Sequence, residues 1–434
     1  MIPGELKNLL FIAYYFPPLG MGGVQRATKF ARYLPEFGWQ PHIITVKDIL
    51  YYATDSSLLD EISHLNIIRT GSLDPARLAK LLPYSGGQVG ARSKMGGRMS
   101  ALPVFFRHIF YPDSKIFWRP FAQQKIRSLR RRIQFHAVFS TAPPISSHLI
   151  AAKTGLPWVA DFRDYWTIGD GIYAPTALHK KKYRQIMQRI TKRAVKITAV
   201  SRPIADSIRE TAAETDRHKI VVLPNGFDPN DFQAVTPGQF KKFTIVYSGN
   251  LNSKRSPVNL FRALESIFAE RPGLQNKIQC IFIGRHFELN LPPLSHNLQT
   301  IVKYHDYVPH AESLSYTLGA DLLLLLLASD SAPGVLTGKI FEYLGTGKPV
   351  LAIIPRHVAA YRLLKDKPNC FIADPDDVPS IKKTLLQILA LFLEKAGKTG
   401  YSGNIPDWLQ KYTRQFQTQQ LAELLDEGLT GKVG

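Results

Sequence analysis

Short runs of consecutive apolar residues are the feature that most restricts the fold of this chain. "LLFIAYYF" (9–16) ends at two prolines, and "ADLLLLLLA" (320–328) contains six leucines in a row. A strand that is buried on both faces has this pattern, because helices cover both sides of a parallel sheet. Such runs are too short to cross a bilayer as a helix. We therefore expect parallel sheets that lie between layers of helices.

Strands and helices are expected to alternate along the chain in two successive series. The first series has a helix at 22–38 and strands at 9–16, 42–47, 136–141, 157–162, 196–201 and 219–224. The second has helices at 258–269, 313–319 and 339–345 and strands at 243–249, 278–284, 320–328, 349–354 and 370–373. Each alternation is typical of a doubly wound sheet.

The two series predict an α/β chain with two Rossmann-like domains that face a central cleft. A length of 434 residues suits two domains. The division is placed at "PNGFD" (224–228), because its Asn-Gly pair signals a turn. The domains are predicted over 1–225 and 226–406. The amphipathic segment 407–429 is expected to pack back on the first domain as a helix or a pair of helices.

The net charge of +21 favours an anionic partner. Residues 91–134, the basic tract, hold eleven lysines and arginines against one acid, and residues 179–196 hold eight with no acid. Aromatic residues are mixed with the arginines of the basic tract, as on a surface that lies against anionic lipid headgroups. The alternative is a solvated helix. We expect an anionic membrane surface as partner and no nucleic acid, because no recognisable nucleic-acid module accompanies the charge.

The expected location is the cytoplasm, with peripheral contact to the inner face of the cell membrane. Two cysteines, Cys280 and Cys370, cannot form a disulfide framework, which indicates a reducing compartment. The apolar run at 9–16 lacks the flanking charge and the cleavage site of a signal peptide.

Two motifs follow predicted strands of the first series. "PPLGMGGVQR" (17–26) joins a strand to a helix, where glycines let backbone N–H groups approach a phosphate. It lacks the third glycine of a dinucleotide fingerprint, and a flexible loop is the alternative. In "DFRDYW", Asp161, Arg163 and Asp164 lie where open α/β sheets bind ligands. An internal ion pair is the alternative for these three residues.

Two motifs of the second series differ in what they predict. In "YSGNLNSKRS" (247–256), Lys254 and Arg255 follow a strand and can reach a diphosphate, unless the loop is simply solvated. "DPD" (374–376) has an Asp-x-Asp spacing that also occurs at metal–nucleotide sites. It lies between a short strand and a helix, so we interpret its aspartates as turn and N-cap residues. The sequence therefore predicts no metal site.

The stretch "GVLTGKIFEYLGTGKPV" (334–350) contains a short helix between glycines. Lys339 and Glu342 lie three residues apart, near one face of the first turn of this helix. From there, the lysine can reach a diphosphate and the carboxylate can reach a ribose. An ordinary buried helix is the alternative.

Over nearly its whole length the chain resembles retaining glycosyltransferases of the two-Rossmann-domain (GT-B) type, and in particular those of family 4. The order and spacing of the matching blocks are more specific than any one block. The blocks are "GMGG", "TAPPISSHLIA" (141–151), "WVADFRDYW" (158–166), "AVSRPIADSI" (199–208), "VVLPNGFD", "YSGNL", "FIG" and "GKIFEYLGTGKPVLA".

The resemblance implies a donor site in the second domain and an acceptor site mainly in the first. By position, Gly22 and Gly23 match the glycine loop near the donor diphosphate. Lys339 matches a position close to the phosphates. Glu342 matches the second glutamate of the family's Glu-x7-Glu pattern, which binds the ribose hydroxyls.

The chain departs from this pattern at the position that contacts the donor sugar. The first glutamate of the pair, which contacts the donor sugar, corresponds to Gly334. Sugar contacts are therefore expected from the backbone near Gly334, or from neighbours such as Ser331 or Thr337.

Two further departures concern charge. The family's Gly-Arg pair after the first strand of the second domain reads Gly-Asn here, with Asn250 in place of the arginine. Lys254 or Arg255 is expected to substitute for that cation. The basic residue near the reaction centre corresponds to Arg163 rather than to a histidine. Transferases of the lipopolysaccharide and capsule type resemble this Arg-Asp variant, so Asp161, Arg163 and Asp164 are the predicted catalytic residues.

The resemblance implies transfer of a sugar from a nucleoside diphosphate sugar to a glycan or lipid-linked acceptor, with retention of anomeric configuration, in surface polysaccharide biosynthesis. No cofactor or metal is expected. Two alternatives stay open from the sequence. One is a nucleotide-sugar epimerase on the same fold, and the other is a non-catalytic nucleotide-sugar-binding protein with a degenerate site.

Overall fold

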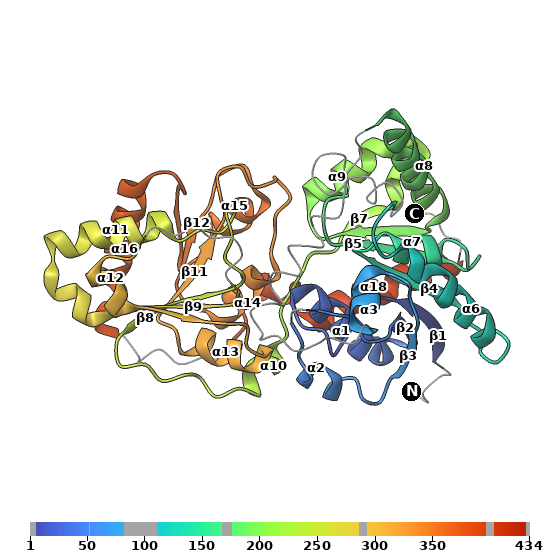
Figure 1. Ribbon diagram of the computed structural model, residues 1–434, viewed down its shortest axis with the longest axis horizontal. Helices are drawn as coiled ribbons and strands as arrows, with labels where there is room; N and C mark the ends of the chain where they lie inside the picture. Colours follow the sequence, from blue (N-terminus) through green and yellow to red (C-terminus); the bar gives the residue numbers. More distant parts are fainter. Residues whose placement is uncertain are drawn as a thin grey trace. The chain divides into compact units, whose positions relative to one another are not determined.

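The computed structural model describes residues 6–51, 53–81, 111–166, 176–285, 293–395 and 403–430. The chain forms two compact units, Met1–Leu223 with Thr418–Gly434, and Pro224–Gln417. Each unit has a sheet flanked by helices (Figure 1). Residues 91–110 of the basic tract lie outside the described residues. Among the helices described, none combines the length and the apolar character that a membrane span requires.

The described part of the first unit contains a seven-stranded parallel sheet in the order β3-β2-β1-β4-β5-β6-β7. Its strands are β1 Lys7–Ile12, β2 Trp39–Val46, β3 Asn66–Thr70, β4 Ala137–Ala142, β5 Trp158–Phe162, β6 Lys196–Ala199 and β7 Ile220–Val222. The predicted set lacked β3, because this edge strand is only partly buried and has no continuous apolar run. The strand order reverses between β1 and β4.

Helices cover both faces of this sheet. They are α1 Gly22–Tyr33, α2 Ser57–Asp60, α3 Pro75–Leu81, α6 Arg119–Leu129, α7 Ser146–Ala151, α8 Ala177–Arg193, α9 Arg202–Thr211 and the later turns of α18 Arg414–Thr430. The segment 407–429 comprises two helices, α17 Asp407–Gln410 and α18. From α18, Leu421, Ala422 and Leu425 are buried in a core that also contains Leu9 and Phe11 of β1.

A buried ion pair holds α1 against three strands of the first unit. The Nη2 atom of Arg26 lies 2.8 Å from Oδ1 of Asp161 on β5, and neither side chain is exposed. Thr141 of β4 and Thr198 of β6 also donate hydrogen bonds to this carboxylate, at 2.8 and 2.7 Å. Burial raises the pKa of Asp161, but Arg26 and the hydroxyl donors outweigh burial and leave the pKa below its usual value.

The described part of the second unit repeats the topology with six parallel strands, in the order β10-β9-β8-β11-β12-β13. The strands are β8 Phe243–Ser248, β9 Ile278–Ile283, β10 Val302–His305, β11 Leu322–Leu326, β12 Val350–Ile353 and β13 Cys370–Ala373. The predicted set lacked β10, another edge strand, whose sequence VKYH is half polar. The strand order reverses between β8 and β11.

The leucine run shows why this sheet needs a helical layer on each face. Leu322, Leu324 and Leu326 belong to one core with α11 Val258–Glu270, α12 His296–Ile301 and α16 Val378–Phe392. The alternate residues, Leu323 and Leu325, belong to a second core with α10 Pro229–Gln233, α13 His310–Gly319, α14 Gly338–Thr346 and α15 Ala359–Leu364. Figure 1 shows α11 and α16 on the side of the sheet away from α13. Successive side chains of a strand point to opposite faces, so β11 must be apolar throughout.

The Arg26–Asp161 pair gives a stability prediction for the first unit. In Arg26→Met, the carboxylate of Asp161 stays buried without its cation, so we expect the free energy of unfolding to fall by about 3–5 kcal/mol. Urea unfolding at neutral pH measures this, followed by tryptophan fluorescence from Trp39, Trp118 and Trp158, which are buried in the first unit.

The matched control is Arg202→Met on α9. Arg202 pairs with Asp206, and the two side chains are 72% and 48% exposed. Exposed pairs of this kind contribute about 0.5 kcal/mol. Equal losses in Arg26→Met and Arg202→Met would contradict a structural role for the buried pair.

Candidate functional site

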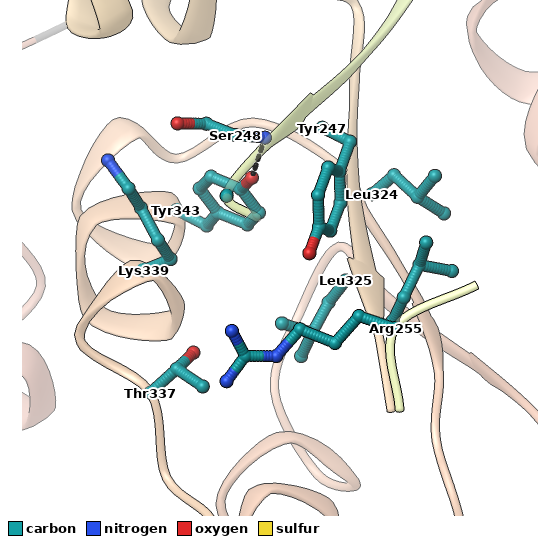
Figure 2. Close-up of a pocket in the computed structure, with 10 residues that line it drawn as sticks. Tyr247, Ser248, Arg255, Leu324, Leu325, Thr337, Lys339 and Tyr343 are labelled. Atoms are coloured by element: carbon teal, nitrogen blue, oxygen red, sulfur yellow. Dashed lines mark hydrogen bonds between the residues drawn. The ribbon is translucent and has the colours of Figure 1, made fainter. Parts of the chain in front are cut away.

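An open hollow lies at the carboxyl ends of β8 and β11 in the second unit, and its space of about 320 Å³ includes open solvent. Its lining comes from the carboxyl ends of β8 and β11, the loop after β8, and α14 with its N-cap residue (Figure 2). The lining residues include Tyr247, Gly249, Arg255, Thr337, Lys339 and Tyr343. Open α/β sheets bind ligands outside the carboxyl ends of their strands, at the point where the strand order reverses. The hollow lies at that point, and we refer to it as the switch-point hollow.

Tyr343 attaches α14 to the end of β8. Its hydroxyl accepts a hydrogen bond of 2.9 Å from the backbone N–H of Ser248, as the dashed line in Figure 2 shows. Burial raises the pKa of Tyr343 well above its usual value, so this hydroxyl stays protonated. The Ser248 side chain is in turn hydrogen bonded to Ser313 of α13, with 2.7 Å between the oxygens. These contacts hold α14 beside the hollow through its second turn.

Among the described residues, the start of α14 presents a hydroxyl group that has no hydrogen-bond partner. The first N–H groups of any helix lack partners within the helix and carry partial positive charge. Thr337, the N-cap residue, does not use its side chain as a cap. Its Oγ1 atom is buried and has no hydrogen-bond partner in the described part of the chain. Figure 2 shows the guanidinium of Arg255 pointing toward Thr337. This end of the hollow is suited to an anion.

Lys339 and Glu342 are paired in the first turn of α14. The lysine Nζ lies 2.8 Å from Oε2 of the glutamate, and His310 Nε2 lies 3.5 Å from Oε1. Glu342 is 6% exposed. Burial raises its pKa, but Lys339 and His310 together outweigh burial and hold the pKa far below its usual value. Glu342 is therefore ionised at neutral pH. Lys339 is among the residues that line the hollow, whereas Glu342 is not.

The two predicted loop cations have different surroundings. Arg255 lines the switch-point hollow, whereas Lys254 forms an ion pair with Asp330 in which both side chains are more than half exposed. Asn250 joins the loop after β8 to the loop after β9, because its side-chain oxygen accepts a hydrogen bond of 3.2 Å from the backbone N–H of Arg285. Of these three residues, Arg255 lines the hollow, and Lys254 and Asn250 are not among its lining residues.

The residues that were predicted to contact the sugar also differ in whether they line the hollow. Gly334 is buried in the segment between β11 and α14 and is not among the lining residues. Ser331 is 7% exposed, and its carbonyl accepts a hydrogen bond from His357. Of these neighbours, Thr337 lines the hollow.

In the first unit, Arg163 links the loops at the β1/β4 switch point. Its guanidinium donates to the carbonyls of Gly23, Ala142 and Pro143, the last two at 3.1 and 2.8 Å. A Cβ atom at Gly23 would overlap the guanidinium, so glycine is required there for this contact. Gly22 is the first residue of α1 and has open space around its Cα.

The three predicted catalytic residues do not form one cluster of exposed groups. Asp164 is exposed after β5, and Arg163 is partly buried. Asp161 is fully buried and already contacts Arg26 and two threonines, so its side chain has no access to a substrate. We therefore assign Asp161 to the internal ion pair, the alternative considered for this motif, although its partner is Arg26 and not Arg163.

Sequence reasoning missed Arg26, Tyr343 and His310. Arg26 had a signal, because it lies on the same helix face as the apolar Phe30, where a charged residue needs a buried partner. The sequence contains no such signal for Tyr343 or His310, since each contacts a residue that is distant along the chain.

Comparisons with known proteins agree with this architecture. Residues 21–231 match the model of the family described as Glycosyltransferase Family 4. No curated protein sequence matches the chain significantly. A glycosyltransferase from Rickettsia africae has 16% identity and a TM-score of 0.60, over 99% of this chain and 100% of that one.

Two further solved structures resemble the chain. Sucrose-phosphate synthase from Thermosynechococcus elongatus has 12% identity and a TM-score of 0.61, over 98% of this chain and 100% of that one. A putative UDP-N-acetylglucosamine 2-epimerase from Listeria monocytogenes has 10% identity and a TM-score of 0.52, over 99% of this chain and 98% of that one. At these identities the likeness concerns the fold, and it confirms the predicted α/β chain with two Rossmann-like domains of the GT-B type.

The surroundings of Arg255 and Lys254 give a binding prediction. Hydrogen bonds to charged groups contribute about 1.5–3 kcal/mol, so we expect Arg255→Ala to weaken the binding of a nucleoside diphosphate by at least about tenfold. Lys254→Ala, the matched control, should change the affinity by less than about threefold, because Lys254 is exposed and paired with Asp330. Titration calorimetry with UDP, GDP and ADP measures both. A larger loss in Lys254→Ala would contradict the assignment.

Proposed function

We propose that this protein transfers a sugar from a nucleoside diphosphate sugar to a glycan or lipid-linked acceptor, with retention of anomeric configuration. The observation that carries the proposal is the switch-point hollow of the second unit, which is lined by Arg255, Lys339 and Thr337. The Thr337 hydroxyl has no hydrogen-bond partner among the described residues. The family match over 21–231 adds support from the first unit.

The proposed donor site uses each group for one part of the nucleotide sugar. The diphosphate lies against Lys339, Arg255 and the first N–H groups of α14, which are preorganised donors for an anion. Glu342 accepts hydrogen bonds from the ribose hydroxyls. Each carboxylate oxygen has two acceptor sites, so Glu342 can do this while it keeps Lys339 and His310.

The proposed reaction breaks the bond between the anomeric carbon and the diphosphate oxygen and forms a bond from an acceptor hydroxyl to the same face of that carbon. The acceptor proton passes to an oxygen of the departing diphosphate. Negative charge grows on the diphosphate as the bond breaks, and Lys339, Arg255 and the helix N–H groups stabilise it. Arg163 and Asp164 are proposed to act near the acceptor. In this proposal the cations of the chain make a metal ion unnecessary.

A nucleotide-sugar epimerase is the second candidate function. The specific observation in its favour is the similarity to the putative 2-epimerase from Listeria monocytogenes, at a TM-score of 0.52. The two functions differ in their products. An epimerase changes the donor sugar without an acceptor, whereas a transferase releases nucleoside diphosphate only when an acceptor takes the sugar.

The donor assignment predicts the behaviour of two variants. We expect one or more of UDP-glucose, GDP-mannose and ADP-glucose to raise the melting temperature of the wild-type protein, because a ligand that binds the native state stabilises it. Lys339→Ala and Glu342→Gln should lower the affinity for that nucleotide sugar by at least about tenfold. Lys254→Ala serves as the control with unchanged affinity. Unchanged binding in both site variants would refute the donor assignment.

Turnover is followed by release of nucleoside diphosphate in the presence of lipid-linked acceptors. We expect the rate to be unchanged by EDTA. A loss of activity in EDTA that Mg²⁺ or Mn²⁺ restores would contradict the metal-independent part of the proposal. Tight binding without turnover for any acceptor would instead support a non-catalytic binding protein.

We also propose that the acceptor is lipid-linked, that it belongs to a surface polysaccharide pathway, and that the protein works at the inner face of the cell membrane. Support comes from exposed cations of the basic tract, in α6 and the turn after it: Lys125, Arg127, Arg130, Arg131 and Arg132. α8 exposes seven more: Lys180, Lys181, Lys182, Arg184, Arg189, Lys192 and Arg193.

One arginine at the start of α6 lies close enough to an arginine of α8 to be affected by its charge. Burial lowers the pKa of Arg119 at the start of α6, and the charge of Arg189 on α8 lowers it further. Like charges that are held together favour an external anion, such as the phosphates of a lipid surface.

The membrane contact predicts selective binding to anionic vesicles. Each basic residue near an anionic surface contributes about 1 kcal/mol, so Arg130, Arg131 and Arg132 changed together to Gln should weaken binding about 100-fold. Flotation with phosphatidylglycerol vesicles measures this. The matched control changes Lys241, Lys277 and Lys303, which are exposed in the second unit, to Gln. Equal binding to phosphatidylcholine vesicles, or equal losses in the two triple variants, would contradict the contact.

A further inference from the structure

Four charged or titratable groups form a connected row behind the switch-point hollow. Asp231 lies on α10, His310 is the first residue of α13, and Glu342 and Lys339 lie on α14. His310 has Nδ1 4.0 Å from Asp231 Oδ2 and Nε2 3.5 Å from Glu342 Oε1. The imidazole therefore stands between two carboxylates, and one of these is the proposed ribose-binding group.

The row is shielded from solvent. The side chains of Asp231, His310 and Glu342 are 14%, 10% and 8% exposed, and that of Lys339 is 26% exposed. Partly buried charges are less screened by water and salt than exposed ones. The charge state of His310 is therefore felt at Lys339, which lines the hollow.

The net charge of the row depends on one proton. With His310 neutral, the two carboxylates and one lysine sum to −1, and with His310 protonated the sum is zero. An incoming diphosphate is an anion. It is repelled by the net charge of −1 on the row when His310 is neutral, and it meets no net charge when His310 is protonated. A bound anion and a proton on His310 therefore favour each other.

We propose that His310 positions the carboxylate of Glu342 and takes up a proton when the donor diphosphate binds, so that donor affinity depends on pH. This inference rests on the proposed donor site. His310 does not line the hollow and acts through Glu342, so it is a positioning residue.

The direction of the pH dependence follows from the charge sum. Histidine is the side chain whose ordinary titration lies between about pH 5 and 8. Protonation of His310 removes one negative charge from the row, so donor affinity is expected to fall as the pH rises. Among the described residues, the carboxylates of Asp231 on α10 and Glu342 on α14 lie within 4.0 Å of the ring, and Lys339 is paired with Glu342. Glu312, on the same helix as His310, is exposed.

The experiment measures the affinity of the wild-type protein for the tightest binder among UDP-glucose, GDP-mannose and ADP-glucose. These donors carry no phosphate proton that titrates near neutral pH, because each phosphorus has one ester bond, one anhydride bond and a single strongly acidic OH group. Couplings between two sites are typically about 5- to 150-fold, and we expect affinity to fall about tenfold between pH 6 and pH 8. Calorimetry in two buffers of different ionisation enthalpy should show proton uptake on binding at pH 7.

Two variants separate the role of His310 from other titrations. His310→Gln keeps a polar side chain without a titrating group, so its affinity should be nearly the same at pH 6 and pH 8. His296→Gln, at an exposed histidine of α12, should keep the wild-type profile. The proton uptake of the wild type tests the inference even if His310→Gln does not fold.

The outcomes distinguish this inference from the proposed function. If no nucleotide sugar binds the wild type, the proposed function fails and the inference fails with it. If a nucleotide sugar binds and Glu342→Gln weakens it, but binding takes up no proton or His310→Gln keeps the pH dependence, only the inference is overturned.

Discussion

Both units depend on one topological constraint, the reversal of strand order inside a parallel sheet. Where β1 adjoins β4 and β8 adjoins β11, consecutive connections leave toward opposite faces, so the loops at the carboxyl edge separate. In the second unit this separation opens the switch-point hollow, and the contact from Ser248 N–H to Tyr343 fixes α14 at its rim. In the first unit, Arg163 occupies the equivalent position and joins the carbonyls of Gly23 and Pro143.

The buried carboxylates of the two units differ in whether their partners also line a hollow. Asp161 receives hydrogen bonds from Arg26 and from two threonines, and its side chain has no exposed surface. Glu342 contacts Lys339 and His310, and Lys339 in turn lines the hollow. Removing a partner from Asp161 leaves a buried charge uncompensated, which concerns stability. Changing a partner of Glu342 alters the charge that a bound anion meets, which concerns ligand affinity.

The central strands could be predicted because burial on both faces leaves a continuous apolar run, as in 9–16 and 320–328. The edge strands β3 and β10 could not, since one side of each is open and their sequences are mixed. Lys339 and Glu342 could be paired from sequence, because residues three apart in a helix face the same way. His310 could not be found, since its contact with Glu342 depends on how α13 packs beside α14.

The sequence by itself determined the fold class and the segments that carry polar groups to the carboxyl edges, because periodicity and turn residues act locally. Tertiary structure decided which of those groups face a ligand. Of two adjacent loop cations, Arg255 lines the hollow and Lys254 pairs with Asp330. Lys339 and Lys348 are nine residues apart. Lys339 lines the hollow, whereas Lys348 is buried, and burial lowers the pKa of Lys348. The physical reason is that burial and charge pairing arise between elements that are distant along the chain, so composition and spacing do not contain them.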